Sequence, residues 1–170
     1  DWLAATAQRH GIWIFAGSLP LTATSPDKMR NSTLVFNPAG VCVERYDKVH
    51  LFGFKNGDES YDEAAFIEPG SQVVSVVTPF GTVALSICYD LRFPELYRAL
   101  APADLILVPA AFTDTTGRAH WEILLRARAI ENQCYVLAVG QGGRHENSRV
   151  THGNSMIVDP WGEILDRKMK

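Results

Sequence analysis

Apolar residues in this sequence occur in short runs separated by turn residues, a pattern that predicts many strands and few helices. Three of the turns are rich in Pro and Gly and lie between two apolar runs, which is typical of antiparallel hairpins. The predicted hairpins pair residues 33–36 with 41–46, 73–77 with 82–87, and 155–158 with 163–165. Further short strands are predicted at residues 12–16, 104–108 and 135–139.

Three segments carry helical signals. Residues 2–10 predict the last turns of a helix that ends at Gly11. Residues 91–94 open a second helix that ends near Leu100. Residues 120–132 predict a longer helix, whose apolar face is expected to consist of Ile123, Leu124, Ala127 and Ile130. Charged residues at helical spacing are expected to pair along it, namely Glu122, Arg126, Arg128 and Glu131.

The order of these elements indicates the fold class. Hairpins mixed with strand–helix–strand units imply a mixed sheet covered by helices, and the continuous apolar run 105–108 implies a strand buried on both faces. Two packed sheets flanked by helices would bury this many strands, so we expect an α/β fold in one domain over residues 1–170. Residues 52–72 are polar and poorly periodic and are expected to form a long loop, a feature that is often functional.

Composition narrows the function classes. The chain has 170 residues, of which 46% are hydrophobic and 21% charged, as in an ordinary globular domain. A net charge of −3 without a basic stripe argues against a nucleic-acid partner. The longest apolar runs, such as residues 105–111, are far shorter than the ~20 residues of a membrane helix, so no membrane partner is expected.

Cysteine and histidine usage bears on location and cofactors. Three cysteines cannot all pair within the chain, and they lack C-x-x-C spacing, so we expect free thiols in the cytoplasm. The five histidines form no metal-ligand motif, and no glycine-rich phosphate loop occurs. We therefore expect chemistry carried by side chains, with no cofactor and no metal.

Cys88 occupies a position that favours nucleophilic chemistry. It ends a predicted strand just before a helix, so a tight turn would expose its side chain at the edge of the sheet, as in other nucleophile elbows. A helix N-terminus and nearby cations favour thiolate over thiol. A lone cysteine is more often a small buried hydrophobic residue, and Cys42 and Cys134 are interpreted in that way.

A thiolate that attacks an amide requires a base and a group that stabilises the oxyanion. Lys48 follows a predicted strand and precedes the apolar pair Leu51–Phe52, an unusual setting for a lysine, which is most often a solvated surface charge. Glu63 lies in the predicted loop among other acidic residues, and composition alone gives it no special role.

Three more residues have both a binding and a structural interpretation. Arg92 either clamps a substrate carboxylate or forms an ion pair with Asp90 or Glu95. Phe112 follows a strand end and is a candidate to line the acyl pocket. His120 is expected to serve in the pocket or in packing, although as the base for the cysteine it would indicate a Cys–His peptidase.

Five motifs in a fixed order give the sequence a resemblance to the nitrilase (carbon–nitrogen hydrolase) superfamily, over about residues 10–166. They are most similar to the amidase branch that holds deaminated glutathione amidase and omega-amidase. Any one motif is weak evidence, whereas five in the expected order are strong. The motifs are Tyr46–Phe52, the Cys88 elbow through Glu95, Pro109–Phe112, His120–Asn132 and Gly153–Gly162.

The resemblance implies roles and a fold. It implies a four-layer α-β-β-α sandwich and a catalytic Glu–Lys–Cys set. Cys88 is the implied nucleophile, and the Lys48 ammonium and the Tyr89 backbone N–H are implied to stabilise the oxyanion. Counting back from Pro69–Gly70, Glu63 matches a further catalytic glutamate, whose expected role is to orient Lys48 and the attacking group.

One departure from the family pattern is important. No residue matches the general-base glutamate that follows the family's first strand, which we expect upstream of Asp1, and the last strands of the family are also missing. We therefore expect a domain incomplete at both termini. Because base catalysis contributes about 10²- to 10⁴-fold, we expect these 170 residues alone to be weakly active or inactive, while the parent enzyme is active.

The expected reaction is hydrolysis of a small amide through a thioester on Cys88. Nitrile or carbamoyl-amide hydrolysis uses the same residues and stays an alternative, as does a catalytically impaired scaffold. Deaminated glutathione, alpha-ketoglutaramate and simple aliphatic amides are all open as substrates. The resemblance also implies a homodimer or a larger oligomer for the intact protein.

Overall fold

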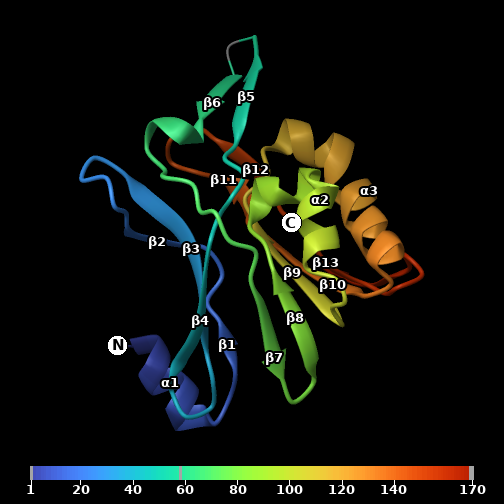
Figure 1. Cartoon of the computed structure of the whole chain (residues 1–170). Coiled ribbons are helices and arrows are strands. Elements are labelled where there is room, and N and C mark those ends of the chain that lie inside the picture. The colour runs from blue at the N-terminus through green and yellow to red at the C-terminus, as the bar shows by residue number, and fades with distance from the viewer. Residues whose placement is uncertain (1, 58, 169–170) are drawn as a thin grey trace. The chain divides into compact units, whose positions relative to one another are not determined.

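The computed structural model describes residues 2–57 and 59–168 (Figure 1). The chain divides into two compact units, residues 1–74 and residues 75–170. Each unit contains one main β-sheet and at least one helix, so the mixed α/β class expected from the sequence is confirmed. Among the described residues, no helix is both long and apolar enough to cross a bilayer.

The first unit is organised around strand β3 (Met29–Phe36). One edge of β3 pairs with β2 (Leu19–Thr22) and, further along, with β1 (Ile14–Phe15), and the other edge pairs with β4 (Cys42–Asp47). Helix α1 (Trp2–His10) ends as predicted, since Gly11 follows it with φ of 61°. The predicted hairpin of residues 33–46 is confirmed as β3–β4, whereas β2 was not predicted.

The expectation of a long loop over residues 52–72 is wrong in part. This segment contains an antiparallel hairpin of β5 (Gly53–Asn56) and β6 (Glu59–Asp62), followed by a 3₁₀ turn, η1 (Glu63–Ala65). The ring of Phe52 contacts the rings of Phe54 and Tyr61, at centroid distances of 6.1 and 5.6 Å. Aromatic contacts of this kind stabilise a hairpin whose strands are too short to show a clear periodicity in the sequence.

The second unit contains a six-stranded sheet in the order β14-β13-β10-β9-β8-β7 (Figure 1). The three central strands, β8, β9 and β10, run parallel, and the outer strands are antiparallel to their neighbours. The strands are β7 (Ser75–Thr78), β8 (Gly81–Leu85), β9 (Leu105–Ala110), β10 (Tyr135–Gly140), β13 (Ser155–Val158) and β14 (Ile164–Lys168). All six strands were predicted, and a small pair, β11 (Gly142–Arg144) with β12 (Val150–His152), was not.

Two helices and a 3₁₀ turn complete this unit. They are η2 (Cys88–Arg92), α2 (Pro94–Ala99), with Pro94 in its first turn as predicted, and α3 (Asp114–Asn132). The helices supply Leu96, Trp121 and Leu125 to a core that also holds alternate residues of β9, β10 and β13. Parallel strands covered in this way read as continuous apolar runs, which explains why β9 was evident from the sequence.

The predicted apolar face of α3 is wrong in part, although Leu124 does pack against the core. Ile123 and Ile130 are 66% and 51% exposed, whereas Trp121, Leu125 and Ala129 are buried against the sheet. The helix carries two apolar stripes at helical spacing, and periodicity alone does not choose between them. The larger Trp121 side chain, packed against Phe112 with ring centroids 4.9 Å apart, occupies the core side.

Candidate active site

Cys88 lies at a strained elbow. Strand β8 ends at Leu85, and the 3₁₀ turn η2 begins at Cys88, whose φ is 53°. A side chain with a Cβ rarely adopts this left-handed conformation, and such strain concentrates at functional positions. The elbow expected from the sequence is therefore present. The Cys88 side chain is half-buried and packs against the core of the second unit.

Two buried charged residues hold the backbone of the elbow. The Asp90 carboxylate, which has no exposed surface, accepts a hydrogen bond of 2.8 Å from the backbone N–H of Ile87. From α3, Arg128 donates two hydrogen bonds to the carbonyl oxygen of Leu91, and its Nη1 pairs with the Glu131 carboxylate at 2.6 Å. The residues on both sides of the cysteine are thus fixed by charged hydrogen bonds, which are stronger than neutral ones.

A buried hydroxyl chain supports the same elbow from α2. The Tyr97 hydroxyl donates to Ser86 Oγ at 3.0 Å, and Ser86 donates to the carbonyl oxygen of Leu107 at 2.8 Å. Burial strongly raises the pKa of Tyr97, partly offset by its hydrogen bond with Ser86, so the hydroxyl stays protonated as a donor. This chain ties the end of β8 to its neighbour β9.

The structure groups three of the predicted binding residues at this edge of the sheet. The Arg92 guanidinium lies over the rings of Tyr89 and Phe112, 5.7 and 5.6 Å from their centroids. Its Nη2 lies 3.2 Å from Nδ1 of His120. Contacts of this type orient a cation while leaving part of its donor set available. Arg92, Tyr89 and Phe112 therefore form one cationic and aromatic cluster, with His120 beside it.

Lys48 and Glu63 also meet, within the first unit. The Lys48 side chain is only 2% exposed, and its ammonium pairs with Glu63 Oε2. The same Oε2 accepts a hydrogen bond of 2.7 Å from the backbone N–H of Phe52, and Oε1 lies 3.4 Å from the side-chain amide nitrogen of Asn31. A buried lysine of this kind requires an acidic partner. Asn31 and the backbone of Phe52 were not identified from the sequence, because both act through contacts distant along the chain.

The six predicted residues thus fall into two sets. Lys48 and Glu63 belong to the unit of residues 1–74, and the other four, Cys88, Tyr89, Arg92 and Phe112, belong to the unit of residues 75–170. Within the described residues, no group of three or more His, Cys, Asp or Glu side chains is arranged to hold a metal ion.

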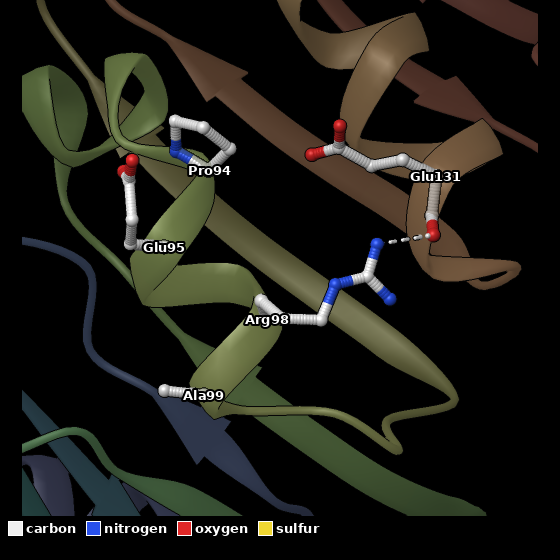
Figure 2. Close-up of a pocket in the computed structure, with 5 residues that line it drawn as sticks. All are labelled: Pro94, Glu95, Arg98, Ala99 and Glu131. Atoms are coloured by element: carbon white, nitrogen blue, oxygen red, sulfur yellow. Dashed lines mark hydrogen bonds between the residues drawn. The ribbon is translucent and has the colours of Figure 1, made fainter.

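A shallow hollow of about 510 Å³ lies beside α2 and the end of α3 (Figure 2). The Arg98 side chain crosses it and donates a hydrogen bond of 3.1 Å to the backbone carbonyl oxygen of Glu131. Its lining residues are Pro94, Glu95, Arg98, Ala99 and Glu131. None of the six predicted site residues belongs to this lining, so the hollow is separate from the cysteine elbow.

Comparison with known proteins identifies the family. The profile of the carbon-nitrogen hydrolase family matches residues 1–168. The chain belongs to the carbon–nitrogen hydrolase family. The resemblance inferred from the motifs is therefore confirmed.

Two relatives in this family are deaminated glutathione amidases. The chain is 49% identical to that of Yersinia enterocolitica over 164 residues, which cover 94% of the chain and 57% of the relative. It is 48% identical to that of Synechocystis over 170 residues, covering 96% of the chain and 62% of the relative. The chain thus spans about three fifths of the length of these relatives.

Solved carbon–nitrogen hydrolases share the fold. The NitFhit protein of C. elegans aligns with a TM-score of 0.89 at 43% identity, over 97% of this chain and 41% of that one. A mutant amidase from Nesterenkonia aligns with a TM-score of 0.83 at 31% identity, over 99% of this chain and 61% of that one, and carries the acetamide moiety of fluoroacetamide at its active-site cysteine. The nitrilase type of fold expected from the motifs is confirmed.

Proposed function

We propose that this chain carries the nucleophile of an amidase that cleaves the C–N bond of a small acid amide. The observation that carries the proposal is the left-handed conformation of Cys88, φ 53°, at the elbow between β8 and η2. A strained residue held by buried Asp90 and Arg128 is typical of a preorganised nucleophile. The amidase names of the relatives support the same reaction.

The proposed reaction has two steps. The Cys88 sulfur attacks the amide carbonyl carbon, the C–N bond breaks, and ammonia, or an amine where the amide nitrogen carries a substituent, leaves with the proton that the thiol released. Water then attacks the thioester, releases the carboxylic acid and restores the thiol. The Lys48 ammonium and the Tyr89 backbone N–H stabilise the oxyanion formed in both steps, and Glu63 orients Lys48. No residue of the sequence matches the general base of the family.

Arg92 is proposed to select substrates that bear a carboxylate. Its guanidinium is fixed over Tyr89 and Phe112 at the same edge of the sheet as Cys88. An oriented guanidinium binds a carboxylate through two parallel hydrogen bonds. Deaminated glutathione and alpha-ketoglutaramate carry such a group, whereas simple aliphatic amides do not.

The experiment measures release of the carboxylic acid product by the protein encoded by the complete gene, with these three kinds of amide and a nitrile as substrates. We expect Cys88→Ala and Lys48→Met to lower kcat at least about 10³-fold, and Arg92→Met to raise KM only for substrates with a carboxylate. His120→Ala separates amidase from peptidase chemistry, because removal of the base of a Cys–His enzyme would abolish kcat, whereas removal of a neighbour of Arg92 is expected to change KM alone. Full activity in Cys88→Ala, or faster turnover of the nitrile, would contradict the proposal.

A further inference from the structure

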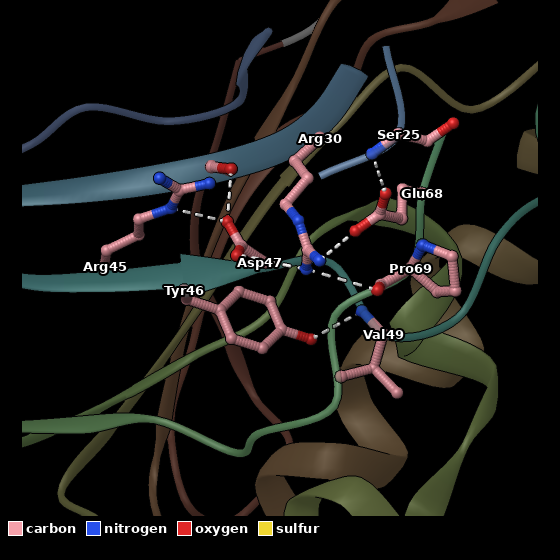
Figure 3. Close-up of polar contacts among 9 residues, drawn as sticks. Ser25, Arg30, Arg45, Tyr46, Asp47, Val49, Glu68 and Pro69 are labelled. Atoms are coloured by element: carbon pink, nitrogen blue, oxygen red, sulfur yellow. Dashed lines mark hydrogen bonds and ion pairs between the residues drawn. The ribbon is translucent and has the colours of Figure 1, made fainter. Parts of the chain in front are cut away.

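A charged cluster of Arg30, Asp47 and Glu68 joins three segments of the first unit (Figure 3). Arg30, in β3, pairs through Nη1 with Asp47 at 3.3 Å and through Nη2 with Glu68. Nη1 also donates a hydrogen bond of 3.3 Å to the backbone carbonyl oxygen of Pro69. One guanidinium therefore connects β3, the end of β4 and the segment of residues 68–69.

The two carboxylates of this cluster are held from other directions as well. Asp47 accepts hydrogen bonds from Ser32 Oγ at 2.5 Å and from Arg45 Nε at 2.7 Å. The Glu68 carboxylate accepts a hydrogen bond of 2.8 Å from the backbone N–H of Ser25. The side chains of Arg30, Asp47 and Glu68 are only 19–22% exposed, so the cluster is better shielded from solvent than an ordinary surface ion pair.

The backbone of Lys48 lies between the segments that this cluster joins. Its N–H donates a hydrogen bond to the backbone carbonyl oxygen of Asn31, and its own carbonyl oxygen accepts one from the backbone N–H of Gly70, both with a length of 2.8 Å. The fit at Gly70 is tight, since a Cβ there would lie 2.1 Å from the carbonyl oxygen of Asp47. Residue 49 is held too, because Val49 N–H donates to the buried Tyr46 hydroxyl at 3.3 Å.

The charged cluster and the Lys48–Glu63 pair lie on opposite faces of β3. Arg30 and Ser32 both contact Asp47, while Asn31, between them, reaches Glu63. Successive side chains of a strand point to opposite faces. The charged cluster therefore contacts one face of β3, and the Lys48–Glu63 pair lies on the other face. Arg30 therefore affects Lys48 and Glu63 only through the backbone segments that it joins.

We propose that Arg30 is a positioning residue, which fixes the segment of residues 63–70 against β3 and β4 so that Lys48 and Glu63 keep their mutual geometry. The inference rests on the proposed function, in which the Lys48 ammonium must lie where the oxyanion forms. A misplacement of about 1 Å at such a group lowers the rate by about 10²-fold. Arg92 belongs to the other unit, where it contacts Tyr89, Phe112 and His120.

The test compares Arg30→Met with Arg45→Met as a matched control. Arg45 pairs with the same Asp47 carboxylate but is 42% exposed, and its guanidinium pairs within β4. In the protein encoded by the complete gene, we expect Arg30→Met to lower kcat by about 10- to 100-fold with KM changed less than about threefold. We expect Arg45→Met to stay within about twofold of the wild type.

A second readout does not depend on activity. Lys48 is buried, so acetylation of its amine by acetic anhydride, measured by peptide mass spectrometry, is slow in the native chain. We expect about tenfold faster labelling in Arg30→Met. Amide exchange at Val35, buried in the far half of β3, measures opening of the sheet in the same sample.

The outcomes separate the two proposals. Positioning by Arg30 is supported if Arg30→Met has a lower kcat and faster acetylation of Lys48, while amide hydrogen exchange at Val35 is unchanged. Lys48 that stays protected in folded Arg30→Met, or an equal kcat loss in Arg45→Met, overturns it. If the wild type hydrolyses none of the amides, the proposed function fails while the labelling still decides the positioning role. Arg30→Lys, which keeps the charge but not the three contacts, takes the place of Arg30→Met if that variant does not fold.

Discussion

The guanidinium of Arg128 donates two hydrogen bonds to one acceptor, the backbone carbonyl oxygen of Leu91, at 3.1 and 2.8 Å. Leu91 lies in the turn that begins at Cys88, and Arg128 lies in α3, 37 positions further along the chain. The side chain of Arg128 is 4% exposed and also lies over the Tyr97 ring, 5.3 Å from its centroid. One buried cation thus couples the longest helix of the second unit to the cysteine elbow.

Removal of this cation should destabilise the protein. Arg128→Met leaves the Leu91 carbonyl and the Glu131 carboxylate without their partner, and we expect the free energy of unfolding to fall by about 3 kcal/mol. The control is Arg118→Met on the same helix, where a 75% exposed arginine pairs with Asp114 and a change of at most about 0.5 kcal/mol is expected. Urea unfolding measures both. Equal effects of the two substitutions would contradict the structural role of Arg128.

The strain at Cys88 predicts an unusual order of stability. Cys88→Gly and Cys88→Ala both remove the thiol, but only glycine adopts φ of 53° without steric cost. At an ordinary position glycine is less stable than alanine by about 0.5–1 kcal/mol. We expect Cys88→Gly to be at least as stable as Cys88→Ala in thermal unfolding. A glycine variant about 1 kcal/mol less stable than the alanine variant would show that the elbow is not strained.

The cluster around Arg30 predicts a loss of stability in acid. Burial alone would raise the pKa of Asp47, but hydrogen bonds from Ser32 and Arg45 and the charges of Arg45 and Arg30 outweigh it and lower the pKa. The pKa of Glu68 is also lowered, chiefly by the backbone N–H of Ser25 and then by Arg30. A carboxyl with a lowered folded-state pKa stabilises the fold above its unfolded-state pKa, and this contribution disappears as the pH falls through the folded-state value.

We therefore expect the urea midpoint to fall as the pH is lowered from about 5 to about 3. Asp47→Asn removes one of the two titrating groups, so its midpoint should be lower at neutral pH and should change less over this range. Asp27→Asn, at an exposed position outside the cluster, is the control and should follow the wild-type curve. An Asp47→Asn curve parallel to that of the wild type would contradict this assignment.

Cys42 and Cys134 should differ in reactivity. Burial, and to a smaller extent the charge of Asp104, raise the pKa of Cys134 to about 11. At about pH 8, the thiolate fraction would be roughly two-hundredfold below that of an ordinary cysteine. Cys134 is buried as expected, whereas the expectation of a buried Cys42 is wrong, since Cys42 is exposed at the start of β4. Timed alkylation with iodoacetamide should therefore label Cys42 before Cys134, which should react only after unfolding in urea. Labelling of Cys134 at a rate close to that of Cys42 in the folded protein would contradict this order.

Local signals in the sequence were sufficient for most of the fold. The β3–β4 hairpin, the β7–β8 hairpin and the strands β9 and β10 are defined by turn residues and short apolar runs that lie within a few positions of one another. The β5–β6 hairpin was missed, because its strands of four residues are polar and depend on ring contacts among Phe52, Phe54 and Tyr61. The buried face of α3 was misassigned, because Trp121 and Ile123 belong to competing apolar stripes.

The sequence by itself determined the cysteine at a strand-to-helix turn, the lysine after β4 and the family to which the chain belongs, because each depends on residues adjacent in the chain. Only the tertiary structure decided what holds them. Asn31 reaches Glu63 across 32 positions, Arg128 reaches Leu91 across 37, and Arg30 reaches Glu68 across 38. Contacts between such distant positions leave no periodic signal in a sequence, since they form only when folding brings the segments together.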